Sequence, residues 1–136
     1  MLDGGECAAG LESTIVAVRD GGRIEVLRPG PIDLGAARSV EGTIEAPGQL
    51  ARHYAPGKPV RLNATAAAPD EFLIGFGPVA CDASLSAQGD LAEAAQRLYA
   101  CLHLAAAASQ PRIAVSPVPD QGLGQAINDR LRRAAA

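Results

Sequence analysis

The chain has 136 residues, of which 48% are hydrophobic and 20% are charged, and its formal net charge at pH 7 is −3. This length suits one domain or a domain with an arm. The net charge excludes nucleic-acid binding through a basic field, and no apolar stretch is long enough to cross a bilayer. Three widely spaced cysteines and an N-terminus without an apolar signal core predict a cytoplasmic protein with reduced thiols.

The first predicted element is a β-hairpin. Residues 13–18 (STIVAV) are mostly β-branched and apolar, and residues 23–27 (RIEVL) alternate with period two. The residues between them, 19–22 (RDGG), favour a turn. Two strands alone are only marginally stable in water, so this segment needs a partner.

A proline-rich connector and an α/β segment follow. Five of the ten prolines lie between residues 29 and 59 and predict an irregular, stiff linker. The elements expected after it are strands at 60–62 and 72–76, a helix that begins after Asp90 and ends before Pro111, a strand at 113–115, and a last helix with Leu123, Ile127, Leu131 and Ala134 inward. Asp90 and Glu93 predict a capping box. The alternation predicts an α/β fold with a small, Rossmann-like, mainly parallel sheet and flanking helices.

Three segments carry residues suited to binding. Ser13 and Thr14 follow three glycines and offer hydroxyls and backbone N–H groups to an anion, or they simply follow a glycine-rich turn. Arg28 stands directly before a Pro-Gly turn, where a planar donor fork suits phosphate or carboxylate, or where an ordinary surface arginine lies. His53 and Tyr54 lie in the connector and either stack on a base or anchor the linker.

The remaining reactive side chains predict structural roles. No two of the cysteines and histidines have the spacing of a zinc site, and no nucleophile elbow is present. The cysteines and histidines concerned are Cys7, Cys81, Cys101, His53 and His103. Arg130, Arg132 and Arg133 predict a solvated basic end of the last helix, with Asp129 paired to Arg133 on its outer side.

The order of these segments resembles a known family. DGGECAAGLESTIV, LRPGPI and PGQLARHYAPGKPVRL follow one another as in the long form of threonylcarbamoyl-AMP synthase, the YrdC-like enzyme of tRNA modification. GDLAEAA and the closing GLGQAINDRLRRA resemble that family's accessory domain. The resemblance implies a remnant of the YrdC-like catalytic domain in residues 1–44, an interdomain linker in 45–58 and an accessory C-terminal domain in 59–136.

The resemblance also implies a chemistry. The family joins threonine, bicarbonate and ATP, with Mg²⁺, into threonylcarbamoyl-adenylate and releases pyrophosphate, and partner proteins then modify tRNA. By matching motif, Ser13, with Thr14 beside it, falls where the family contacts threonine. Arg28 falls where the family contacts the nucleotide phosphate, and His53 and Tyr54 lie in the linker that folds over the nucleotide.

One departure from the family limits what this chain is expected to do. The family's K-x-R motif and substrate cleft lie upstream of the matching segments, and the only lysine here is Lys58 in the connector. We therefore expect a fragment that makes no adenylate alone, holds no cofactor tightly and does not contact nucleic acid directly. Residues 13–27 would lack neighbouring strands, and we expect this segment either to be mobile or to dock on a second copy of the chain. The alternative is an independent, non-catalytic α/β module that binds a nucleotide or a partner protein.

Overall fold

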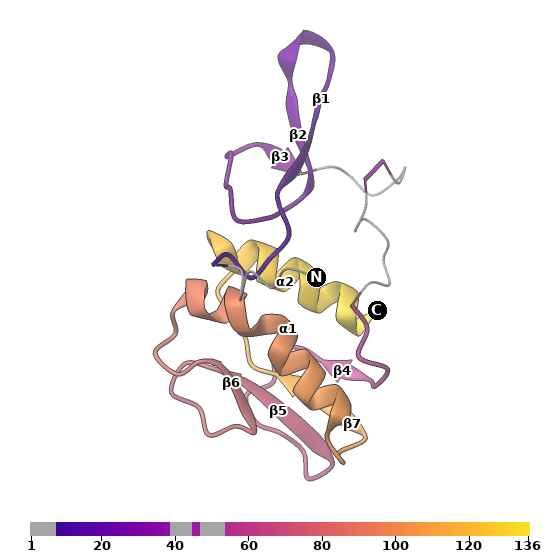
Figure 1. The fold of residues 1–136 in the computed structure, drawn as a ribbon, viewed down its shortest axis with the longest axis vertical. Coiled ribbons are helices and arrows are strands. Elements are labelled where there is room, and N and C mark those ends of the chain that lie inside the picture. The colour runs from indigo at the N-terminus through magenta and orange to yellow at the C-terminus, as the bar shows by residue number, and fades with distance from the viewer. Residues whose placement is uncertain (1–7, 39–44, 47–53) are drawn as a thin grey trace, which may run out of the picture.

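The computed structural model describes residues 8–38, 45–46 and 54–136, so Cys7 and His53 lie outside the described residues. The elements are β1 (Ile15–Val18), a 3₁₀ turn (Asp20–Gly22), β2 (Ile24–Arg28), β3 (Ala37–Arg38), β4 (Val60–Arg61), β5 (Glu71–Phe76), β6 (Ala83–Ser86), α1 (Leu91–Ala107), β7 (Arg112–Val115) and α2 (Leu123–Ala135). Figure 1 shows α1 and α2 between the hairpin and the larger sheet. In the described part of the chain, neither helix is long and apolar enough to span a membrane.

The predicted N-terminal hairpin is confirmed. β1 pairs antiparallel with β2, and Val16 lies opposite Val26 in the register. The short strand β3, which the proline-rich pattern did not predict, adds a parallel partner to β2. Val18 at the end of β1 is 71% exposed, so the hairpin presents apolar surface to solvent. Self-association through this surface stays a prediction.

The second sheet is parallel throughout, as predicted. Its order is β4-β7-β5-β6, and Ile74 in β5 lies opposite both Val115 in β7 and Ala83 in β6. Strand β6 was missed because its sequence, ASLS, is only four residues long and has no β-branched residue. The chain then crosses over the sheet through α1 and inserts β7 between β4 and β5 (Figure 1).

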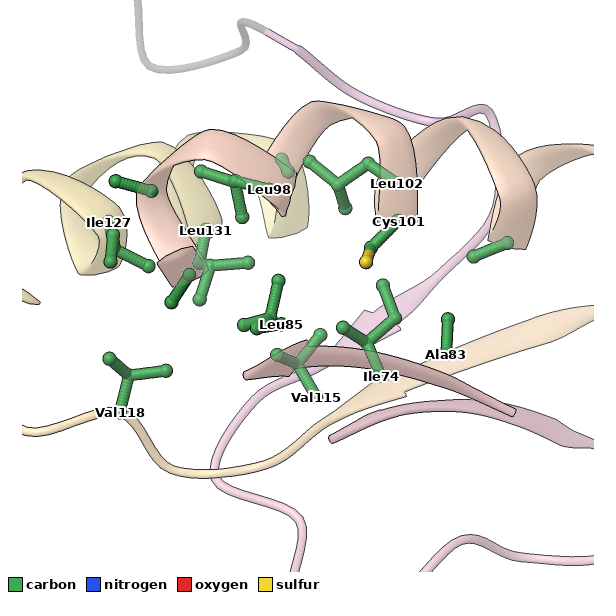
Figure 2. Close-up of a cluster of buried hydrophobic side chains, with 14 of the residues drawn as sticks. Ile74, Ala83, Leu85, Leu98, Cys101, Leu102, Val115, Val118, Ile127 and Leu131 are labelled. Carbon is green, nitrogen blue, oxygen red and sulfur yellow. The ribbon is translucent and has the colours of Figure 1, made fainter. Parts of the chain in front are cut away.

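The core lies between this sheet and the two helices. Figure 2 shows Leu98 and Cys101 of α1 and Ile127 of α2 facing Ile74 and Val115 of the sheet, and all five side chains are almost fully buried. Burial of one such leucine or isoleucine contributes about 1.5–3 kcal/mol. The predicted three- and four-residue spacing along both helices is therefore the spacing of the core contacts.

Asp90 caps α1, but the predicted capping box is only half formed. The Asp90 carboxylate accepts hydrogen bonds from the N–H groups of Ala92 (2.7 Å) and Glu93 (2.9 Å). Glu93 does not reach back to the cap, because the Asp90 N–H donates to Ser86 Oγ (2.9 Å) and the Glu93 carboxylate lies 3.4 Å from Arg97. The hydroxyl of Ser86, at the end of β6, thus replaces the reciprocal bond.

Lys58, from the connector, caps the other end of α1. Its ammonium donates to the carbonyl oxygens of Ala105 (2.9 Å) and Ala108 (2.6 Å), and the last turn of α1 has no basic residue of its own. Lys58→Met should therefore lower the free energy of unfolding by about 1–2 kcal/mol in a urea titration. Arg97→Met, which removes an exposed i,i+4 pair, is the control and should cost less than about 0.5 kcal/mol. Equal losses for both variants would contradict the capping role.

Candidate functional site

The hairpin brings two of the predicted site residues, Ser13 and Arg28, into contact. Arg28 ends β2, and its Nε and Nη2 atoms donate to the carbonyl oxygen of Ser13 at 3.2 and 3.0 Å. Nη2 also lies 3.5 Å from Ser13 Oγ. The Arg28 residue is buried, whereas Ser13 is exposed. The arrangement places a fixed guanidinium beside an accessible hydroxyl.

A close backbone approach holds this contact in place. A Cβ atom added to Gly30 would lie only 2.3 Å from the Thr14 nitrogen and 2.7 Å from the Glu12 carbonyl oxygen. Thr14 is engaged here by its hydroxyl, which donates to the carbonyl of Ile32 (2.9 Å) and accepts from its N–H (3.1 Å). The turn after β2 is therefore fastened to the segment that carries Ser13 by packing and by two hydrogen bonds.

Glu12, the residue before Ser13, is the centre of a polar cluster. The Tyr99 hydroxyl of α1 lies 2.9 Å from both carboxylate oxygens of Glu12, and Arg130 Nε of α2 donates to one of them at 3.0 Å. Tyr54, from the connector, stacks at a tilt on Tyr99 with ring centroids 5.2 Å apart. The structure thus places Tyr54 beside Tyr99, which contacts Glu12, the residue before Ser13.

Arg130 corrects the prediction of a solvated basic end. It is fully buried, and its Nη1 donates to the carbonyl oxygen of Pro29 (2.8 Å) and to Asp129 (2.9 Å). Asp129 is also buried rather than on an outer face, and it accepts a further bond from Arg133 (3.0 Å). Burial is tolerated because Glu12 and Asp129 offset the guanidinium charge. Arg132 alone of these arginines is exposed.

Sequence reasoning missed three residues of this cluster, and one of them carried a usable signal. Arg130 is three residues after Ile127 and four before Ala134, so the helical period places it on the inward face. Glu12 and Tyr99 carried no such signal, because 87 residues separate them in the chain. His103 is exposed on α1, as expected. Among the described residues, no group of three or more His, Cys, Asp or Glu side chains is placed to hold a metal ion.

The cluster lowers the pKa of the Glu12 carboxyl group. Burial alone would raise its pKa, but hydrogen bonds from Tyr54, the Glu12 backbone, Tyr99 and Arg130 lower the pKa from 4.5 to about 2. Burial and the Glu12 carboxylate both raise the pKa of Tyr99. Glu12 is therefore ionised, and both tyrosine hydroxyls are protonated donors, at neutral pH.

This lowered pKa predicts an acid-dependent stability. The carboxylate contributes fully above pH 4.5, its ordinary pKa, and the contribution is lost as the pH falls from 4.5 to about 2, the pKa in the folded chain. The Tm of the chain should therefore exceed that of Glu12→Gln at pH 7, and the difference should shrink between pH 4.5 and 2. Circular dichroism melts at several pH values measure both. Parallel Tm curves for the two proteins would contradict this role for Glu12.

A separate cavity of about 280 Å³ lies at the carboxyl ends of β4 and β7. Its polar lining comes from Asn63, Ser116, Asp120, Asn128 and Arg132. In open parallel sheets this edge is a common place for ligands. The cavity shares no residue with the Ser13–Arg28 contact.

Together these features define a small parallel α/β module whose helices hold a hairpin that carries a serine–arginine pair. A model of the family described as the C-terminal domain of threonylcarbamoyl-AMP synthase matches residues 23–136. The chain therefore belongs to this family, and the resemblance found in the sequence is confirmed. No curated protein sequence matches the chain.

Two solved structures show the same fold. One is P. abyssi Sua5 complexed with L-threonine, with 27% sequence identity, a TM-score of 0.77, and coverage of 98% of this chain and 48% of that chain. The other is a P. abyssi Sua5 variant in which an adjacent histidine and tyrosine are replaced by alanine, with 24% identity, a TM-score of 0.74, and coverage of 98% and 47%. This chain spans about half the length of both.

Proposed function

We propose that the chain is the C-terminal part of an L-threonylcarbamoyladenylate synthase for tRNA modification. The proposed parts are the end of the catalytic domain in residues 1–44, a linker in 45–58 and an accessory domain in 59–136. The observation that supports the proposal is the Arg28–Ser13 contact, because a guanidinium, a group suited to anions, lies beside an exposed serine there. The family match and the L-threonine complex of P. abyssi Sua5 support it.

The roles proposed for the residues follow their chemistry. Ser13 would contact threonine through its hydroxyl, with Thr14 fixing the backbone beside it. Arg28 would bind a nucleotide phosphate, for which a planar guanidinium is well suited. His53 and Tyr54 would cover the nucleotide from the linker. ATP with Mg²⁺, threonine and bicarbonate are the proposed ligands of the whole enzyme, and tRNA-modification proteins are its proposed partners in the cytoplasm.

The proposal includes inactivity of this chain alone. A triphosphate must be held by several positioned donors at once, and the contact at Ser13 supplies one guanidinium, that of Arg28. With ATP, Mg²⁺, threonine and bicarbonate, we expect no release of pyrophosphate above the rate without protein. Pyrophosphate release that depends on threonine would overturn this part of the proposal.

A binding experiment tests the site itself. In an NMR titration with ATP, signals of Ser13, Thr14 and Arg28 should move, with a Kd above about 1 mM. Arg28→Ala should abolish these shifts. Arg112→Ala, which removes the arginine that begins β7, should leave them unchanged. Shifts that survive Arg28→Ala would place nucleotide binding elsewhere.

The second candidate function is the independent, non-catalytic module that binds a small ligand. The cavity at the carboxyl ends of β4 and β7 favours it, since Asp120 and Arg132 there offer both charges to a polar ligand. The same ATP titration separates the two functions. Shifts confined to Asn63, Ser116 and Asn128 would support the second function and count against the first.

A further inference from the structure

We propose that Arg130, on the last helix, is a positioning residue for the Ser13–Arg28 pair. The inference rests on the proposed function for the identity of the ligands, but not for the positioning itself. Arg130 touches neither Ser13 nor Arg28 in any hydrogen bond. Instead it binds Glu12, the residue before Ser13, and Pro29, the residue after Arg28.

The geometry of these contacts carries the proposal. One guanidinium donates through Nε to the Glu12 carboxylate (3.0 Å) and through Nη1 to the Pro29 carbonyl (2.8 Å). Asp129, the preceding residue of α2, accepts from the same Nη1 (2.9 Å). The fork is rigid and planar, so it fixes the Glu12 carboxylate relative to the Pro29 carbonyl and thereby ties together the two segments to which they belong. Those segments carry Ser13 and Arg28.

Stability alone is a poor reason for an arginine at this position. Arg130 is fully buried, and its Nη2 has no hydrogen-bond partner among the described residues. A well-packed apolar side chain in place of a buried ion pair is often as stable or more stable. The arginine is better explained by what an apolar side chain lacks, which is donors that reach Glu12 and Pro29.

The same contacts extend to the connector. Glu12, held by Arg130, also receives the Tyr99 hydroxyl, and Tyr99 stacks on Tyr54. A hydrogen bond from Tyr54 contributes to the lowered pKa of Glu12. Arg130 therefore belongs to one network with the residue that precedes Ser13 and with the linker tyrosine. In this arrangement the accessory domain sets the geometry of the site instead of only following it in the chain.

The test compares Arg130→Lys and Arg130→Met with Arg112→Lys in the full chain. Lysine keeps the charge and much of the length but lacks the fork. Arg112 pairs with Asp70 and Glu71 at the far end of the sheet and is the control for losing an arginine ion pair. The readout is hydrogen exchange of the Arg28 Nε–H group, measured by NMR without any ligand, with circular dichroism to confirm folding.

For Arg130→Lys we expect Arg28 Nε–H exchange at least about 10-fold faster, and shifted Ser13 and Thr14 amide signals, with no such change for Arg112→Lys. Unchanged Arg28 exchange in a folded Arg130→Lys variant would overturn the proposal. If Arg130→Met does not fold, Arg130→Lys and Glu12→Gln still test the proposal. Glu12→Gln weakens the contact that Arg130 makes with the segment before Ser13, so it should also make Arg28 Nε–H exchange faster.

An ATP titration of the same variants separates this inference from the proposed function. If the unchanged chain binds ATP through Arg28, Arg130→Lys should weaken that binding by about 10-fold or more while Arg112→Lys should not. If the unchanged chain binds no ATP at Arg28, the nucleotide role proposed for Arg28 fails, and the exchange measurement alone still supports or overturns positioning by Arg130.

Discussion

Leu98→Ala should lower the free energy of unfolding of this chain by about 2–5 kcal/mol. Leu98 lies on α1, has no exposed surface, and packs in the core between the helices and β5, β6 and β7 (Figure 2). Its neighbours come from rigid elements on every side, so the surrounding structure can collapse only partly into the space that the substitution leaves. The loss therefore includes both the transfer of the leucine side chain and the energy of the cavity.

Leu104→Ala on the same helix is the matched control. Leu104 is 58% exposed, and the substitution is chemically identical in the same type of secondary structure. We expect a change within about 0.5 kcal/mol. Urea titrations followed by circular dichroism at 222 nm measure both variants. A similar loss for Leu98→Ala and Leu104→Ala would mean that the described core does not hold α1 against the sheet.

The fold was predictable wherever the local pattern and the tertiary environment agree. α1 and α2 carry the helical period of the face that they bury, and the hairpin strands are apolar segments on either side of a turn sequence. β6 was not predictable, because Ala83–Ser86 has weak strand propensity and is a strand only through its pairing with β5. β3 was not predictable either, since it lies within a proline-rich connector and, in the described part of the chain, is a two-residue strand paired with β2.

For the candidate site, the sequence predicts the residues but not the contacts that support them. Ser13 and Arg28 could be found because Ser13 lies just before β1 and Arg28 ends β2, where antiparallel pairing of the two strands brings these segments together. Arg130 was assigned to solvent because its partner Glu12 is 118 residues away, and a charge is expected at the surface unless such a partner is known. The tertiary pairing of Arg130 thus reverses the local prediction.

Gly30→Ala should have the largest effect on the site. The new Cβ would lie 2.3 Å from the backbone nitrogen of Thr14, where ordinary contact begins near 3.4 Å, so the two segments must separate by about 1 Å. Both partners are backbone and cannot rotate away. In enzymes, a misplacement of about 1 Å lowers the rate of a positioned reaction by up to about 100-fold. The Arg28–Ser13 hydrogen bonds, at 3.0 and 3.2 Å, should break first.

Arg28 Nε–H exchange by NMR measures this separation, and urea titration should show a loss of about 1–3 kcal/mol from overpacking. Gly35→Ala is the control, because it lies in the same loop and a Cβ there meets no atom within 4 Å, although its φ of +58° is strained for alanine. It should cost about 1 kcal/mol and leave Arg28 exchange unchanged. If Gly30→Ala also left that exchange unchanged, the close approach of the turn to Thr14 would not be what holds Ser13 against Arg28. The positioning would then rest on Arg130 and Glu12 alone.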